Sequence, residues 1–159
     1  YESPQPVEEE APAEEYLPGT KENLDVNICP YIEQNPDTKF VVFFPPYSIL
    51  FWNDVVVGNH LEATLAQYRY LAERLNAYDN VEVYFFPDRE DIILDLNNYA
   101  DYSHYHPRYN RFMTECFADG STGLVAKEGS KKGKTIDEYL SHMKTIVQNY
   151  DFEELLSGE

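Results

Sequence analysis

The stretch KFVVFFPP, residues 39–46, is a continuous run of β-branched and aromatic side chains that ends in two prolines. Apolar residues at successive positions, rather than at every second one, are typical of a strand buried on both faces in a parallel sheet. A second run, NVEVYFF at residues 80–86, ends at Pro87. Between the two runs, residues 60–76 carry one apolar stripe at helical spacing. The order strand, helix, strand predicts a βαβ unit with two adjacent parallel strands.

Further segments of the chain have helical patterns. Residues 24–34 carry apolar side chains at helical spacing until Pro36 stops the pattern. Pro107 suits the first turn of a helix, and the apolar spacing that follows it ends at Gly120. Residues 136–147 form the last apolar stripe. We therefore expect an α/β fold, with a small parallel sheet and flanking helices arranged as part of a flavodoxin-like three-layer sandwich.

Composition divides the chain into two parts. Residues 1–22 are rich in Pro, Glu and Ala, so this segment buries too little apolar surface to offset the entropy of ordering it. We expect an acidic tail or linker there, and a single α/β domain over residues 23–159. The chain begins at Tyr1 rather than Met, which we interpret as processing or excision from something longer.

Charge narrows the range of partners. The 159 residues include 29 acidic and 12 basic side chains, for a formal charge of −17, so we expect no binding to nucleic acid.

No apolar run approaches the ~20 residues that span a bilayer, and we expect no direct membrane insertion by this segment. Cys29 and Cys116 have neither the spacing of a zinc site nor the density of a disulfide scaffold, and we expect buried thiols.

The polar stretch DLNNYADYSHYHPRYN, residues 95–110, follows the second predicted strand. Ligands of open α/β sheets bind beyond the carboxyl ends of the strands, where this loop is expected to lie. On a tight loop Asp101 could accept the Nδ1 proton of His104, which leaves Nε2 facing outward as a base. The alternative is a polar corner, because Asp-x-x-His is common by chance and loop histidines often make only local hydrogen bonds.

A second stretch, PPYSILFWN at residues 45–53, follows the first predicted strand and is expected near the same edge. Aromatic rings can stack on sugar faces, so the rings of these two stretches could form a carbohydrate platform. The alternative is that most of the rings fill the core. The expected binding residues are Ser48, Tyr47, Trp52, Tyr102 and His106.

A metal site is a further alternative for the polar loop. Imidazole and carboxylate groups suit zinc, and Asp101, His104 and His106 could combine with His60 or Asp95. His104 and His106 diverge in an extended chain, and His106 stands just before the helix that begins at Pro107. We therefore favour a loop with no metal and no cofactor.

The stretches NPDTKFVVFFPPYSILFW and YDNVEVYFFPDREDIILDLNNYADYSHYHPRYNRFM, with the closing helix, resemble the carboxyl-terminal half of the SGNH (GDSL-like) hydrolase superfamily, in particular a bacterial group of SGNH-like proteins. The resemblance covers about residues 24–150, and its most specific part runs from Asp101 to Pro107. It implies that Asp101 and His104 are the acid and base of a Ser-His-Asp triad. It also implies an extracytoplasmic or membrane-anchored bacterial protein.

One part of the family pattern is missing from this sequence. The nucleophile motif with its Ser, and the Gly and Asn of the oxyanion hole, normally lie upstream, and residues 1–38 contain no such motif. Ser48 follows the first strand without a glycine turn to expose it, and Ser103 is too close in the chain to His104 to present its oxygen easily.

Two classes of function follow. The chain is either the carboxyl-terminal part of an esterase or O-acyltransferase that acts on an acylated glycan or another ester, with the upstream half of the fold missing, or a non-catalytic binding or structural module. The first class predicts that the isolated chain is inactive.

Overall fold

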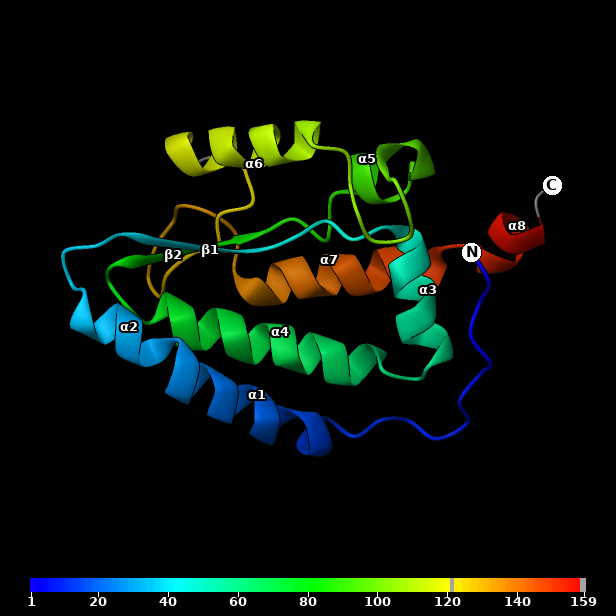
Figure 1. Cartoon of the computed structure of the whole chain (residues 1–159), viewed down its shortest axis with the longest axis horizontal. Coiled ribbons are helices and arrows are strands. Elements are labelled where there is room, and N and C mark those ends of the chain that lie inside the picture. Colours follow the sequence, from blue (N-terminus) through cyan, green and yellow to red (C-terminus); the bar gives the residue numbers. More distant parts are fainter. Residues whose placement is uncertain (121, 158–159) are drawn as a thin grey trace.

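The computed structural model describes residues 1–120 and 122–157, and its centre is a two-stranded parallel sheet (Figure 1). Strand β1 (Phe40–Phe44) pairs with β2 (Val81–Phe85) in a register that runs from Phe40 opposite Val81 to Phe44 opposite Phe85. The predicted adjacent parallel strands are therefore confirmed. Their connection contains the predicted helix α4 (Leu61–Asn76) and a helix that the sequence analysis missed, α3 (Ile49–Val57).

Helices lie on both sides of the sheet (Figure 1). On one side, α4 and α7 (Ile136–Asn149) enclose the main core, and α1 (Ala13–Asn27) packs outside α4 and continues into α2 (Cys29–Gln34). On the other side, α6 (Arg108–Asp119) covers β2 through Tyr84 and Phe86. The remaining elements are α5 (Glu90–Ile93), the 3-10 helix Leu96–Asn98 and α8 (Phe152–Ser157). The small parallel sheet with flanking helices agrees with the expected fold class.

The main core forms where the apolar stripes of α4 and α7 meet the sheet. Val83 and Phe85 of β2 are fully buried there, beside Trp52 of α3 and Met143 of α7. Burial of such side chains contributes about 1.5–3 kcal/mol each to folding. Within the described residues, no helix is both long enough and apolar enough to cross a bilayer.

The amino-terminal segment differs from the tail that we expected over residues 1–22. Helix α1 starts at Ala13 and continues past the expected boundary, because Leu24 is buried and Thr20 accepts a hydrogen bond from Gln67 of α4 at 3.1 Å. Residues ahead of the helix are held by backbone hydrogen bonds, including one from Val7 to the carbonyl of Val57 at 2.9 Å. Helical packing on α4 thus orders a segment whose composition alone predicted a spacer.

Strand β1 is less enclosed than the sequence predicted. Val41 and Phe43 are 38% and 40% exposed, whereas β2 is buried along almost its whole length. The expectation of burial on both faces is correct for β2 and wrong for β1, because β1 lies at the edge of the sheet and α6 covers it only in part, through the contact of Phe117 with Phe43 at 5.5 Å between ring centres.

Candidate active site

The predicted polar loop is fixed to the carboxyl end of β1. The Tyr99 hydroxyl donates a hydrogen bond to the Pro46 carbonyl at 2.6 Å, and the Ser48 hydroxyl donates one to the Tyr102 carbonyl. Within the loop, the Ala100 amide donates to the carbonyl of His104 at 2.8 Å. These contacts place the loop beyond the strand end, where ligands of open α/β sheets bind.

Asp101 and His104 form the predicted pair. Nδ1 of His104 lies 2.7 Å from Oδ2 of Asp101. The other carboxylate oxygen, Oδ1, accepts hydrogen bonds from the backbone amides of Ser103 at 2.9 Å and His104 at 2.8 Å. These two amides, and then the imidazole, hold the pKa of Asp101 well below its usual range. The carboxylate is therefore ionised at neutral pH and orients the ring.

His104 lies beside an open cleft. The side chain of His104 is 80% exposed, and it lines a cavity of about 360 Å³. The other residues of the lining are Pro45, Tyr47, Ser103, Tyr105 and Asn110. Because Nδ1 is taken by Asp101, Nε2 is the nitrogen left to exchange a proton with a bound group.

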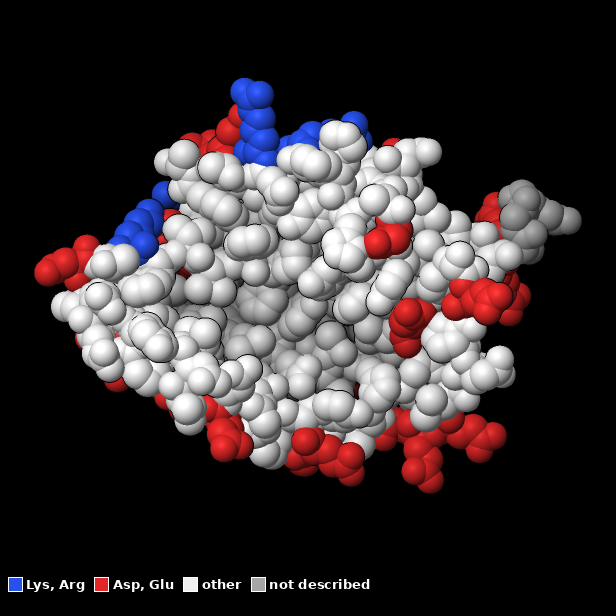
Figure 2. Space-filling view, viewed as in Figure 1, with Lys and Arg blue, Asp and Glu red and all other residues white. Residues whose placement is uncertain are grey.

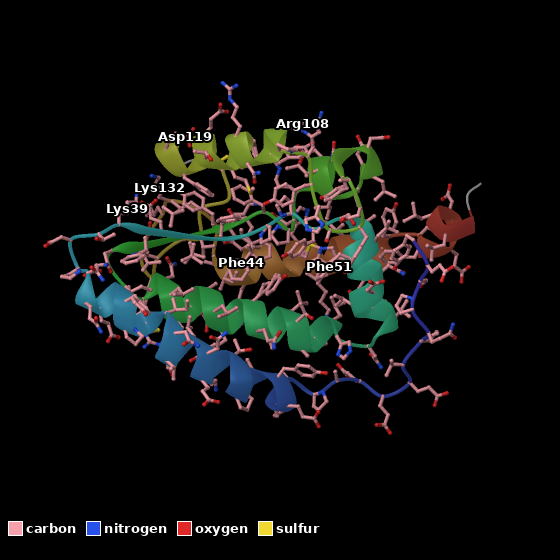
Figure 3. All side chains as sticks on the ribbon, viewed as in Figure 1. Lys39, Phe44, Phe51, Arg108, Asp119 and Lys132 are labelled. Carbon is pink, nitrogen blue, oxygen red and sulfur yellow. The ribbon has the colours of Figure 1, made fainter. Side chains whose placement is uncertain are left out.

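A second layer of contacts supports this loop at the start of α6, where Figure 3 labels Arg108. The Arg108 guanidinium donates hydrogen bonds to Oδ1 of Asn98 and, at 2.9 Å, to the hydroxyl of Tyr109. Asn98 is buried, and its amide in turn donates to the carbonyl of Ile92 at 2.9 Å. Arg108 therefore ties the α6 end of the loop to α5.

Sequence reasoning missed several of these residues. Asn110 lines the cleft and Arg108 holds the loop, although neither was predicted to do so, while Tyr105, one of the rings of the expected carbohydrate platform, also lines the cleft. Asn110 lies in the first turn of the helix that Pro107 predicted, so its place near the loop could have been inferred. The contact of Arg108 with Asn98 depends on the path of the loop, which has no signal in the sequence.

Tyr47, Tyr102 and His106 lie near the pair, but only Tyr47 lines the cleft. Tyr102 is exposed, and its ring centre lies 6.3 Å from that of Tyr1. His106 accepts a hydrogen bond at Nδ1 from the amide of Arg108 at 3.1 Å, which places it at the start of α6. Tyr47 is thus the predicted binding residue best placed to contact a ligand beside His104.

The expected binding roles of Ser48 and Trp52 need correction, because both residues are fully buried. Ser48 is the N-cap of α3 and accepts from the amide of Phe51, while its own hydroxyl donates to the loop. Trp52 packs edge-on against the rings of Phe51 and Tyr68 in the main core. Neither side chain can contact a ligand in the cleft, and both support the structure around it.

Neither Ser48 nor Ser103 is placed to act as a nucleophile that His104 activates. Burial removes Ser48 from the cleft. The Ser103 hydroxyl lies 3.5 Å from Nδ1 of His104, the nitrogen already engaged by Asp101, and also 3.3 Å from Oδ1 of Asp101. A nucleophile activated by His104 must approach Nε2 instead.

The alternative metal set is not brought together. Nδ1 of His60 lies 3.4 Å from the Tyr16 hydroxyl, and Asp95 accepts from the amide of Asn97 at the start of the 3-10 helix. Over residues 1–120 and 122–157, no group of three or more His, Cys, Asp or Glu side chains is arranged to hold a metal ion.

A second histidine with carboxylate partners lies at the carboxyl end of β2. Nδ1 of His142 lies 3.1 Å from buried Asp88, and its Nε2 lies 3.1 Å from Glu90. Because both ring nitrogens have partners, this histidine links α7 to the β2–α5 turn. It differs from His104, which among the described residues has a ring partner at Nδ1 alone and which lines the open cleft.

The chain matches no protein-family model, and neither the curated protein sequences nor the solved structures contain a significant match. The resemblance to SGNH hydrolases is therefore still a prediction.

Proposed function

We propose that Asp101 and His104 are the acid and base of a Ser-His-Asp triad in an SGNH-like esterase or O-acyltransferase. The observation that carries this proposal is the 2.7 Å contact between Oδ2 of Asp101 and Nδ1 of His104, an exposed histidine that lines an open cleft. A polar corner with only a local role would have no need of a cleft beside His104.

The chemistry follows from the direction of this hydrogen bond. Asp101 fixes the tautomer that carries the proton on Nδ1, so that Nε2 has a free lone pair. Nε2 then takes the proton of an attacking hydroxyl and later returns it to the leaving alcohol. The ionised carboxylate stabilises the imidazolium that exists between these two steps. This acyl transfer uses no cofactor.

We place the nucleophile in polypeptide that precedes Tyr1, together with the missing half of the fold. Ser48 is buried and Ser103 approaches the wrong nitrogen, so neither residue can serve. Tyr1 itself contacts the ring of Tyr102 and hydrogen-bonds to Asn53, and a segment that precedes it would therefore enter beside the candidate loop.

An ester carried on a glycan is the substrate class that we favour. The cleft is lined by Tyr47 and Tyr105, and an aromatic face can stack on a sugar ring. Asn110 adds an amide that can donate to, or accept from, a sugar hydroxyl. Such a substrate agrees with an extracytoplasmic or membrane-anchored protein, as proposed from the family resemblance.

The test is ester turnover by the full-length protein, with 4-nitrophenyl acetate and an acetylated oligosaccharide as substrates. We expect His104→Ala to lower kcat by about 100-fold or more, and Asp101→Asn to lower it strongly through the wrong tautomer. His60→Gln, a histidine substitution far from the cleft, is the matched control. The isolated chain of 159 residues should show no turnover. Full activity in both loop variants would overturn the proposal.

One observation favours a non-catalytic module as the second candidate. Oδ1 of Asp101 accepts two backbone amides, which is enough to fold the loop without any chemistry. In that case the full-length protein would bind an acetylated oligosaccharide without cleaving it, and His104→Ala would leave the dissociation constant unchanged.

A further inference from the structure

Strand β1 leaves one edge of the sheet open. The far edge of β2 is occupied, because the amide of Val125 donates to the carbonyl of Val83 at 2.8 Å and the amide of Phe85 donates to the carbonyl of Gly123 at 2.7 Å. In the described part of the chain, β1 has β2 as its single strand neighbour, and no isolated bridge involves it. An unpaired edge is a template for another strand.

The hydrogen-bond register shows which groups of β1 are free. The Phe40 amide donates to Asn80 and the Phe44 carbonyl accepts from Phe86, so alternate residues from Phe40 to Phe44 face β2. The N–H and C=O groups of Val41 and Phe43 therefore point away from β2. The side chains of these two residues are also more than a third exposed.

The open edge lies at the bottom of a hollow. In Figure 1 the view is along the sheet toward β1, with α6 on one side of it and α4 and α1 on the other. Figure 2 shows that this face is hollowed and that Asp, Glu, Lys and Arg side chains are confined to its rim. Lys39 precedes β1, and its ammonium group is paired with Glu82 of β2 at 2.8 Å. This lysine therefore does not block the open edge of β1 against another strand.

The charge along the lower rim of the hollow favours basic groups on an occupant. In Figure 2 acidic side chains follow this lower rim, whereas Lys and Arg side chains lie along the upper and left rim. Helix α1, which lies below α4 in Figure 1, carries the exposed residues Glu14, Glu15 and Glu22, and its Asp25 is paired with Arg74 at 3.6 Å. The net charge of −17 adds a long-range attraction for cations. A second copy of the chain would bring the same negative charge, and its own β1 edge is recessed between helices in the same way.

We propose that β1 binds an extended segment of a partner polypeptide as a third strand, with apolar residues at its centre and Lys or Arg at its ends. The backbone of the partner would pair with the free groups of Val41 and Phe43, and its apolar side chains would cover theirs. The basic ends would face the acidic rim on α1. This proposal uses the side edge of β1 rather than its carboxyl end, and its test measures binding rather than ester turnover. If the upstream half of the fold covers this edge, the full-length protein will not bind the peptide that the 159-residue chain binds, and that result would overturn the proposal.

The experiment measures binding of a fluorescent synthetic peptide, alternating Val and Thr with two lysines at each end, by fluorescence anisotropy at low ionic strength. We expect saturable binding that weakens at least tenfold for Val41→Pro, because proline removes an outward N–H without breaking the pairing with β2. Val26→Ser is the matched control, since Val26 is exposed but lies on α1. It should leave the affinity unchanged.

Two further peptides test the proposal on the unaltered protein, so that the result does not depend on whether Val41→Pro folds. A peptide with N-methyl groups on alternate residues cannot pair with a strand edge, and one with glutamates in place of its lysines should be repelled by the acidic rim. Both should bind at least tenfold more weakly to the unaltered protein. Equal binding of the methylated peptide, no saturable binding of the lysine peptide, or a dimer in solution that Val41→Pro dissociates would overturn the proposal.

Discussion

The Asp101 carboxylate has two contacts with the candidate loop, and each uses a different oxygen. Oδ1 accepts backbone amides and sets the turn, while Oδ2 orients the ring of His104. The turn and the contact with His104 are therefore built by one side chain. Substitution of Asp101 is expected to change both the loop and its chemistry.

The low pKa of Asp101 predicts how the loop responds to acid. An unfolded Asp titrates near pH ~3.9, and the amides of Ser103 and His104, followed by the imidazole, lower the folded value. Stability from this carboxylate is thus present above the unfolded pKa and is lost as pH falls toward the folded pKa. Carbon-13 NMR should show Asp101 still ionised at about pH 3. Titration at or above the unfolded value would contradict this.

Ser48 supplies a second prediction at the residue scale. Ser48→Ala removes the N-cap of α3 and leaves the Tyr102 carbonyl without its donor. We expect a loss of about 1–3 kcal/mol in the free energy of unfolding, measured with urea. Ser141→Ala on the exposed side of α7 is the control and should stay within about 0.5 kcal/mol of the unaltered protein. Similar losses in both variants would show that the cap does not matter.

The spacing of Asp101 and His104 was enough to predict their pairing, because both residues belong to one short loop. The burial of Ser48 and Trp52 was not predictable in the same way. It depends on α3, whose run ILFWNDVVV is apolar at most positions and so lacks a clear helical stripe. Without that helix, both residues looked like part of an exposed loop.

Among the elements, the loop that connects α6 to α7 depends on glycines with positive φ, a left-handed backbone conformation. Gly133 has φ +88°, and a Cβ added there would lie 2.3 Å from the carbonyl oxygen of Leu124. That carbonyl accepts a hydrogen bond from Lys134 at 3.3 Å. The close approach holds this loop beside the segment that pairs with β2.

Gly133→Ala should therefore destabilise the protein by about 2–4 kcal/mol, the sum of backbone strain and a clash with main chain. Gly129→Ala is the matched variant, because Gly129 also has positive φ, +74°, but its added Cβ meets nothing within 4 Å. It should cost about 1 kcal/mol. Urea unfolding of both proteins measures the difference. Equal costs would mean that the loop moves away from Leu124.

The elements with clear periodicity were predicted from sequence, and those without it were not. The stripes of α4, α6 and α7 and the two strand runs gave their positions within a few residues. Helix α1 was missed because a proline, Pro18, lies inside it and its first turn is acidic. Its order comes from packing against α4, a tertiary contact that local composition does not report.

For the whole molecule, the charge of −17 opposes compaction. We expect the free energy of unfolding to rise by about 1 kcal/mol between about 10 mM and 200 mM NaCl, because salt screens the repulsion among exposed carboxylates. Replacement of Glu14 and Glu15 with Gln should reduce this dependence. Urea unfolding at each salt concentration is the measurement, and a fall in stability with salt would contradict the account.

The position of β1 at an edge of the sheet also could not be predicted from the sequence. Its run of apolar residues resembles that of β2, yet the segment 123–125 pairs with β2 and not with β1. Which of two similar strands is central depends on the order of strands in the sheet. Only the assembled structure supplies that order.

The most direct test of the account labels the nucleophile itself. The full-length protein would be treated with a fluorophosphonate, which reacts with activated serines, and the labelled residue identified by mass spectrometry. We predict a label on a serine that precedes Tyr1, with a labelling rate about 100-fold or more lower in His104→Ala and unchanged in His60→Gln. No labelled serine, or a labelling rate that does not depend on His104, would contradict the role of the Asp101–His104 pair.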